Sequence, residues 1–67
     1  MPDHDLPATI RAFRATHHLT QAELGRLLDV PANTIARWER GDQDVRHPSV
    51  LLLALERLGD LLHRPER

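Results

Sequence analysis

The sequence has 67 residues, no Cys, one Trp and a formal net charge of −1. A chain of this length forms a single domain with a thin hydrophobic core, and without Cys no disulfide or thiolate-bound metal can reinforce it. Its stability must therefore come from regular helix packing or from self-association.

The charge balance counts against nucleic-acid binding, because most proteins that bind nucleic acids carry a basic excess. However, all nine basic residues are Arg, whose planar fork of donors suits phosphates and guanine edges. Much of the acidic charge lies in expected tails and loops, so one face of the protein can still be positive.

No targeting segment is evident in the sequence. No apolar run approaches the roughly 20 residues needed to cross a bilayer. The N-terminus lacks the basic and apolar regions of a signal peptide. We therefore expect a cytoplasmic protein without membrane contact.

The first helix is predicted over residues 7–16. Pro7 suits the first position of a helix, and Asp5 before it can face the positive end of the helix dipole. Ile10 belongs to an apolar stripe at helical spacing. Arg11, at the edge of this stripe, is expected to be a plain surface charge.

A second helix is predicted from Thr20 to Leu28. It opens with a capping box, in which Thr20 and Glu23 exchange hydrogen bonds. Gly25 lies in the helix interior, where Gly costs about 1 kcal/mol relative to Ala. This position therefore implies the close approach of another helix.

Residues 29–31 form a tight turn, and Asp29 tolerates a left-handed conformation better than most side chains. The next helix is predicted from Ala32 to Arg40, with Gly41 as its left-handed stop. Together, residues 20–40 form a helix-turn-helix. The second helix of this motif commonly lies in a DNA major groove.

The C-terminal helix begins at Pro48 and is predicted to end at Leu58 or to continue to Leu62. Leu52 and Leu53 lie outside its main apolar stripe, which indicates a second apolar contact. We expect this helix, over residues 48–62, to join two copies of the chain. The expected interface residues are Leu52, Leu53, Leu55 and Leu61.

The segment LTQAELGRLLDVPANTIARWERG, residues 19–41, resembles the helix-turn-helix of the Xre family, the Cro/repressor-like regulators of phages and bacteria. The matching features are Leu-Thr-Gln at the start, a small residue at Gly25, Val30 in the turn, and Thr-Ile-x-Arg-Trp-Glu-x-Gly at the end. The resemblance covers about residues 7–58. It implies an all-α, compact four- to five-helix Cro/repressor-like domain, here residues 1–67, that binds a palindromic operator as a homodimer.

The resemblance also implies roles for individual residues. Ala32, Asn33 and Arg37 correspond to positions that contact bases. Asn suits adenine and Arg suits guanine, each contact contributing about 1–3 kcal/mol of discrimination. Arg14 corresponds to an Arg that pairs with Glu39 and keeps donors for a phosphate. The residues expected to contact phosphates are Thr20, Gln21, Thr34, Arg40, Arg14 and Arg46.

Some residues depart from the family pattern. Asp29 replaces a frequent Gly, and Pro31 replaces a frequent Ser, which leaves the following helix without a side-chain cap. The next loop is often basic in the family, whereas here Asp42 and Asp44 precede Arg46. The C-terminal part also resembles small phage-encoded regulators, including repressors of anti-CRISPR operons.

These features predict a sequence-specific repressor of double-stranded DNA operators, without cofactor, that autoregulates its own anti-CRISPR-type operon. Two alternatives stay open: an antitoxin-like protein whose C-terminal helix grips a toxin, and a helical protein-interaction domain that does not bind DNA. We expect no metal site, because the His residues form no i, i+4 pair. We expect no enzyme either, because Cys and Tyr are absent and no paired carboxylates occur.

Overall fold

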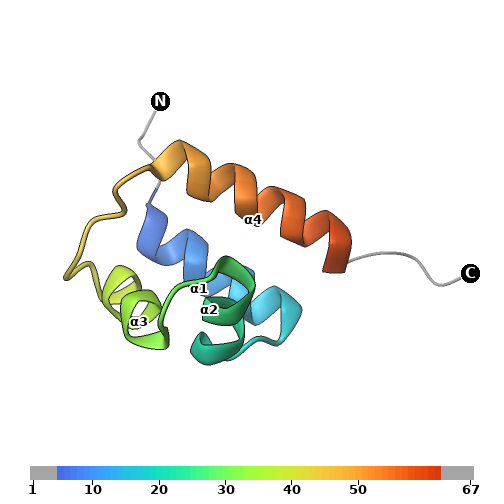
Figure 1. The fold of residues 1–67 in the computed structure, drawn as a ribbon, viewed down its shortest axis with the longest axis horizontal. Coiled ribbons are helices and arrows are strands. Elements are labelled where there is room, and N and C mark those ends of the chain that lie inside the picture. The colour runs from blue at the N-terminus through green and yellow to red at the C-terminus, as the bar shows by residue number, and fades with distance from the viewer. Residues whose placement is uncertain (1–4, 63–67) are drawn as a thin grey trace, which may run out of the picture.

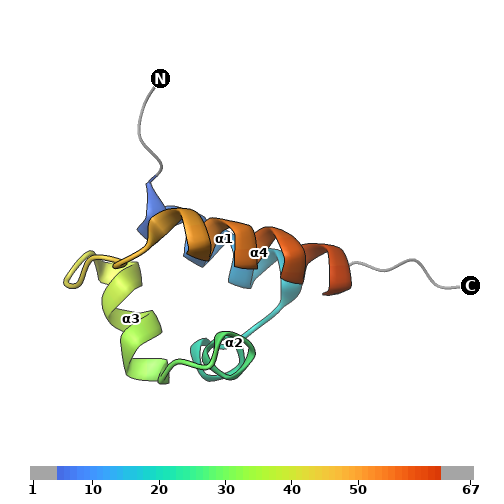
Figure 2. The same cartoon turned by 45° about the horizontal axis from the view of Figure 1, so that its top comes forward.

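The computed structural model describes residues 5–62 of the chain, which contain four helices and no strand. The helices are α1 (Leu6–His17), α2 (Gln21–Leu28), α3 (Ala32–Arg40) and α4 (Pro48–Leu62). Figure 1 shows α4 lying over α1. In Figure 2, α1 and α4 run side by side, with α2 and α3 on the other side of the molecule. The prediction of an all-α domain is confirmed.

Side chains at the helix ends set where α1 and α2 begin. The Asp5 carboxylate accepts a hydrogen bond from the Ala8 N–H at 3.2 Å, so it caps α1. The predicted capping box of α2 is present. The Thr20 hydroxyl accepts from the Glu23 N–H at 3.0 Å, and the Glu23 carboxylate accepts from the Thr20 N–H at 2.8 Å.

The turn between α2 and α3 has the predicted backbone conformation. Asp29 is left-handed, with φ 62°, and it ends α2. Pro31 precedes α3 with φ −64° and supplies no side-chain cap. Gly41 ends α3 at φ 77°. All three residues have the conformations that the sequence predicts, because the conformation of a turn depends mainly on the residues within it.

The hydrophobic core receives side chains from every helix. Ile10, Leu24 and Ile35 are fully buried, and Leu51 and Leu55 are nearly so. Leu55, which the sequence places in a dimer interface, is only 4% exposed. Its side chain fills the core of a single chain, so it is not free to contact a second copy.

The rest of α4 is more open to solvent. The helix reaches Leu62, the longer of the two predicted ends. Val50, Leu53 and Leu61 are 63%, 65% and 47% exposed, whereas Leu52 is half-buried. Since α4 packs against α1 along one side only, its other apolar side chains remain accessible.

The tight packing at Gly25 comes from the turn and not, as the sequence suggested, from another helix. A β-carbon at Gly25 would lie 2.5 Å from the Val30 carbonyl oxygen and 3.4 Å from the Ala32 nitrogen. Gly59 of α4 has more room, since a β-carbon there would lie 3.6 Å from the nearest Phe13 ring carbon. The distance of 3.6 Å at Gly59 is an ordinary van der Waals contact, whereas the distance of 2.5 Å at Gly25 is too short for a real β-carbon.

We expect Gly25→Val to lower the free energy of unfolding by about 1–3 kcal/mol, because the added carbons collide with the turn backbone. Gly59→Ala should raise it by about 0.5–1 kcal/mol, because Ala favours helix and its methyl group fits. Urea unfolding followed by circular dichroism measures both variants. Equal stability of the two variants would contradict the packing described at Gly25.

Candidate nucleic-acid interface

The outer face of α3 carries a row of polar side chains, Asn33, Arg37 and Arg40, here termed the α3 stripe. These residues are three or four positions apart, so they share one face of the helix. All three are exposed, whereas Ile35 and Glu39 on the opposite face are buried. The stripe therefore presents one amide and two guanidinium groups to solvent.

The first turn of α3 lies beside this stripe. Ala32 and Thr34 are half-buried, so each presents only part of its side chain. Pro31 leaves the start of the helix without a side-chain hydrogen bond, as the sequence predicts. The position of α3 must therefore depend on contacts elsewhere in the helix.

Glu39 provides these contacts from the buried face of α3. Its carboxylate accepts two hydrogen bonds from Arg14 of α1, at 2.6 and 2.7 Å, and one from the Gln21 amide of α2, at 3.1 Å. Arg11 of α1 donates to the main-chain carbonyl of the same residue. One residue of α3 is thus tied to both preceding helices, and the predicted Arg14–Glu39 pair is confirmed.

The electrostatics of this cluster keep it ionised. The hydrogen bonds from Arg14 hold the pKa of the Glu39 carboxyl below its ordinary value, although burial alone raises it. The bond from Gln21 lowers this pKa as well. The bond to Glu39 raises the pKa of Arg14 against the effect of burial. Glu39 is therefore a charged and well-paired carboxylate at neutral pH.

The same cluster engages two of the residues expected to contact phosphates. Arg14 uses all three nitrogens, because Nη1 also donates to the Leu19 carbonyl at 3.1 Å. Each of its terminal nitrogens carries a second N–H that can still donate. Gln21 likewise keeps a second amide N–H, and Thr20 beside it is exposed. The N-terminus of α2 thus keeps donors near the surface.

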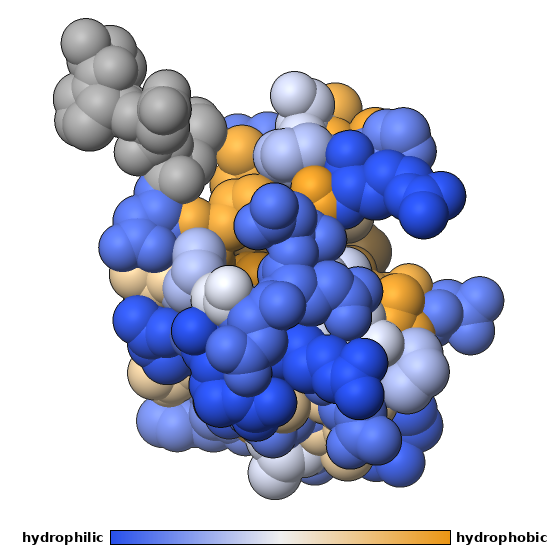
Figure 3. Space-filling model, turned by 90° about the vertical axis from the view of Figure 1, so that its left-hand side faces the viewer, coloured by the Kyte–Doolittle hydropathy of each residue, from blue (hydrophilic) through white to orange (hydrophobic). Residues whose placement is uncertain are grey.

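The remaining predicted phosphate contacts lie at the other end of α3. Arg40 donates from Nε to the Asp42 carboxylate at 2.8 Å, and both side chains are exposed, at 60% and 58%. Arg46 is exposed in the loop between α3 and α4. Figure 3 views the molecule from the side of this loop and shows hydrophilic side chains interspersed with apolar atoms. This end of the surface therefore carries exposed charges of both signs, from Arg40, Arg46 and Asp42.

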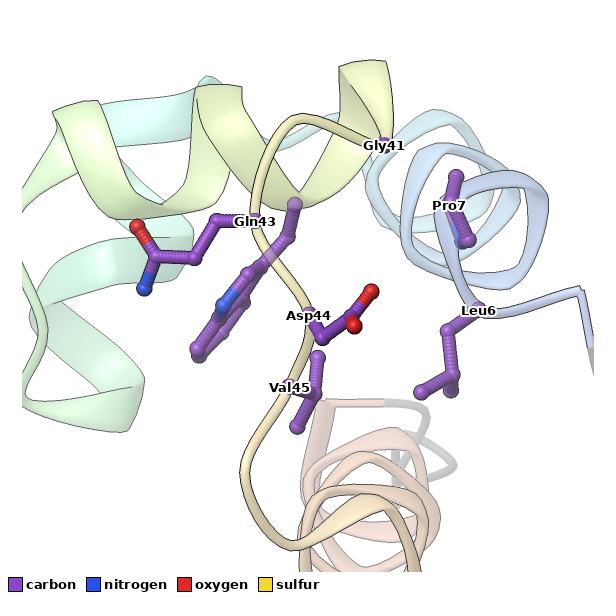
Figure 4. Close-up of a pocket in the computed structure, with 7 residues that line it drawn as sticks. Leu6, Pro7, Gly41, Gln43, Asp44 and Val45 are labelled. Atoms are coloured by element: carbon purple, nitrogen blue, oxygen red, sulfur yellow. The ribbon is translucent and has the colours of Figure 1, made fainter.

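Two hollows adjoin Trp38, which is half-buried. One, of about 190 Å³, lies between the α3–α4 loop and the start of α1 (Figure 4), where Gln43 and Asp44 line its loop side. The other, of about 250 Å³, is lined by α2, the loop and α4. Both are smaller than the roughly 300–1,000 Å³ of typical ligand pockets. Two larger hollows, of about 320 and 540 Å³, lie beside α2 and along α4, away from the α3 stripe. The candidate nucleic-acid interface is the outer surface of α3, because its exposed donors lie there.

Arg11 has a role that the sequence interpretation missed. The prediction that it is a plain surface charge is wrong, because its guanidinium donates to the last turn of α3. The available signal was its spacing from Arg14, three residues further along the same side of α1. Two Arg residues at that spacing can hold the same partner helix.

Comparison with known proteins gives one match. A family model described as a helix-turn-helix domain matches residues 5–67, which include all four helices. No curated protein and no solved structure matches the chain. Within residues 5–62, no helix is long and apolar enough to cross a membrane, and no cluster of His, Asp and Glu could hold a metal ion.

We expect Glu39→Gln to lower the free energy of unfolding by about 3 kcal/mol at pH 7, because it leaves the Arg14 guanidinium without its counter-charge. The pKa of Glu39 is lowered in the folded state. Its stabilising effect is therefore complete above the ordinary carboxyl pKa of about 4.3 and is lost as the pH falls through the folded value.

Urea titrations of wild type and variant at a series of pH values measure this effect. The difference in stability should stay constant between about pH 7 and pH 5 and narrow below about pH 4. A difference that persists unchanged into acid would show that the carboxylate charge is not its source.

Proposed function

The chain belongs to the helix-turn-helix domain family, and on that premise we propose that this DNA-binding regulator is a sequence-specific transcriptional repressor. In the proposal, α3 lies in the major groove of the operator and the N-terminus of α2 faces the DNA backbone. The observation that carries it is the α3 stripe. Its donors are exposed on the outer face of the helix, while Glu39 holds the inner face to α1 and α2.

The exposed groups of α3 suit base recognition. Arg37 offers two parallel N–H donors that match the guanine edge, and the Asn33 amide matches adenine. The methyl group of Ala32 suits the methyl group of thymine. Contacts to phosphates would set the register of the helix in the groove but carry no sequence information. We assign these contacts to Thr20, Gln21, Thr34, Arg40, Arg14 and Arg46.

We further propose that two copies bind one palindromic operator. Val50, Leu53 and Leu61 are exposed apolar residues on α4. They recur at helical spacing, so they form one face that a second copy can cover. This face replaces Leu52 and Leu55 of the sequence-based interface, which are half-buried and buried. A two-fold dimer would place its recognition helices about 34 Å apart, one turn of DNA.

The narrower part of the proposal concerns the regulated genes. The helix-turn-helix segment resembles Xre regulators, and residues 45–62 resemble small phage-encoded regulators of anti-CRISPR operons. A repressor of this kind acts by occupancy, because it accumulates, fills its own operator and blocks RNA polymerase. Repression of its own operon would follow if the operator lies in its own promoter.

One alternative has a structural observation in its favour. The exposed apolar face of α4 would also fit a different protein, as in an antitoxin that holds a toxin. Mass measurement of the protein purified from its native host distinguishes the homodimer from the antitoxin. A homodimer contains one kind of chain, whereas an antitoxin bound to its toxin contains two. The other alternative, a domain that does not bind DNA, is supported by the net charge of −1.

The operator can be found by selecting bound sequences from a random DNA pool, and we expect a palindrome. Arg37→Ala should then weaken binding to the operator by about 10- to 100-fold, because one bidentate guanine contact is lost. Binding to a scrambled duplex should change far less. Fluorescence anisotropy with labelled duplexes gives the affinities.

The matched control is Arg26→Ala, which removes another exposed Arg, from the last turn of α2, where it borders Leu62 of α4 and lies away from the α3 stripe. It should leave operator affinity within about twofold of wild type, since exposed charges far from DNA act weakly. If Arg37→Ala binds the operator as tightly as wild type, then Arg37 contacts no base. A wild-type chain that binds no duplex, or whose binding does not weaken with added salt, would refute the proposed contact with the DNA backbone.

We expect Leu53→Asp to convert the dimer into a monomer, because it puts a charge in the centre of the apolar face of α4. Sedimentation equilibrium measures the mass in solution. Ala12→Asp adds the same charge at an exposed position of α1 and should leave the dimer intact. Loss of the dimer in both variants, or in neither, would count against an α4 interface.

A further inference from the structure

We propose that Asp42 limits the affinity of the protein for DNA by holding Arg40 in an ion pair within the chain. This inference rests on the proposed function, because it concerns the same surface of α3. The residues assigned above favour DNA binding, whereas Asp42 opposes it. The interaction that Asp42 weakens is the contact between Arg40 and a phosphate group of the DNA backbone.

The ion pair lies on the α3 stripe. Arg40 is three residues from Arg37, so both guanidinium groups project from one face of the helix. The Asp42 carboxylate accepts from Arg40 Nε at 2.8 Å, and both side chains remain more than half exposed. One of the two exposed cations of the stripe is therefore neutralised in the free protein.

The main chain holds Asp42 in this place. Gly41 is left-handed, and its N–H donates to the Trp38 carbonyl at 3.1 Å. The Asp42 N–H donates to the Arg37 carbonyl at 2.9 Å. These two bonds fold the chain back over the last turn of α3, in the manner of a Schellman ending. The carboxylate is thus positioned next to Arg40 by the end of the helix itself.

Stability does not account for an acidic residue here. The C-terminus of a helix carries partial negative charge, so a carboxylate there is unfavourable and a cation is preferred. An exposed ion pair contributes little to folding, because water and salt screen it. Asp42 therefore opposes the helix dipole and gains little from Arg40 in return. Its charge also repels an incoming anion.

A phosphate that approaches Arg40 meets this carboxylate. It must either displace Asp42 from the guanidinium or bind beside a negative charge only a few ångströms away, and both weaken the contact. Fewer counterions are also released from DNA when a cation is already neutralised. The complex with DNA is therefore weaker. The protein dissociates from the operator more readily when the protein concentration falls.

The test compares two substitutions that each remove one negative charge from the same loop. Asp42→Asn frees Arg40, whereas Asp44→Asn removes an exposed carboxylate for which the described residues show no ion pair. Fluorescence anisotropy is measured with the selected operator and with a scrambled duplex, over a series of salt concentrations. Each substitution is also made in an Arg40→Gln background.

We expect Asp42→Asn to tighten binding to both duplexes by about fivefold, because the phosphate contact of Arg40 that it strengthens is electrostatic and independent of sequence. The slope of log K against log salt should become steeper, by at most the value of about 0.9 that one complete phosphate contact contributes. Asp44→Asn should change affinity by less than about twofold, because its charge is partly screened. In the Arg40→Gln background, Asp42→Asn should lose most of its effect.

Other outcomes would overturn the proposal. Equal tightening by both substitutions would mean that only the total loop charge matters. Weaker binding by Asp42→Asn would mean that Asp42 orients Arg40 for the phosphate. An effect that survives in the Arg40→Gln background would exclude Arg40 as its route. These results leave the proposed function standing if Arg37→Ala still weakens operator binding, whereas a wild-type chain without salt-dependent DNA binding would refute both.

Discussion

The buried carboxylate of Glu39 is the contact on which the arrangement of the first three helices depends. It accepts hydrogen bonds from Arg14 of α1 and from Gln21 of α2, and its main-chain carbonyl accepts from Arg11. A buried carboxylate is tolerated only when such bonds replace its hydration. Because its donors come from both other helices, the charge also fixes the orientation of α3.

This constraint matters because α3 is too short to be stable alone. It has nine residues and no side-chain cap at its start, and isolated helices of that length are marginal in water. Its inner face supplies Ile35 to the core and Glu39 to the ion pair, so its outer face is left for solvent. The same contacts that stabilise the helix therefore also aim Asn33 and Arg37 outward.

The small size of the domain has a second consequence, at α4. The core takes Leu51 and Leu55, while Val50, Leu53 and Leu61 stay exposed. Packing against α1 cannot bury all of these side chains, because α1 covers only one side of α4. The exposed charges of α3 also partly cancel. A chain with net charge −1 presents two Arg on one stripe, and Asp42 neutralises one of them.

The amino-acid sequence by itself determined the four helices, the capping box of α2, the turn of residues 29–31 and the left-handed end of α3 at Gly41. These features depend on residues within one or two helical turns, such as Thr20 with Glu23 or the left-handed Asp29. The Arg14–Glu39 pair was also accessible, through the resemblance of the segment around it.

Only the tertiary structure decided which leucines of α4 are buried, that Gly25 faces the turn, and that Arg11 holds α3. It also decided that the donors of Arg14 and Gln21 are partly used inside the protein. These outcomes depend on the angle and depth at which helices far apart in sequence pack. Helical periodicity shows which residues share a face, but it does not show how much of that face a neighbouring helix covers.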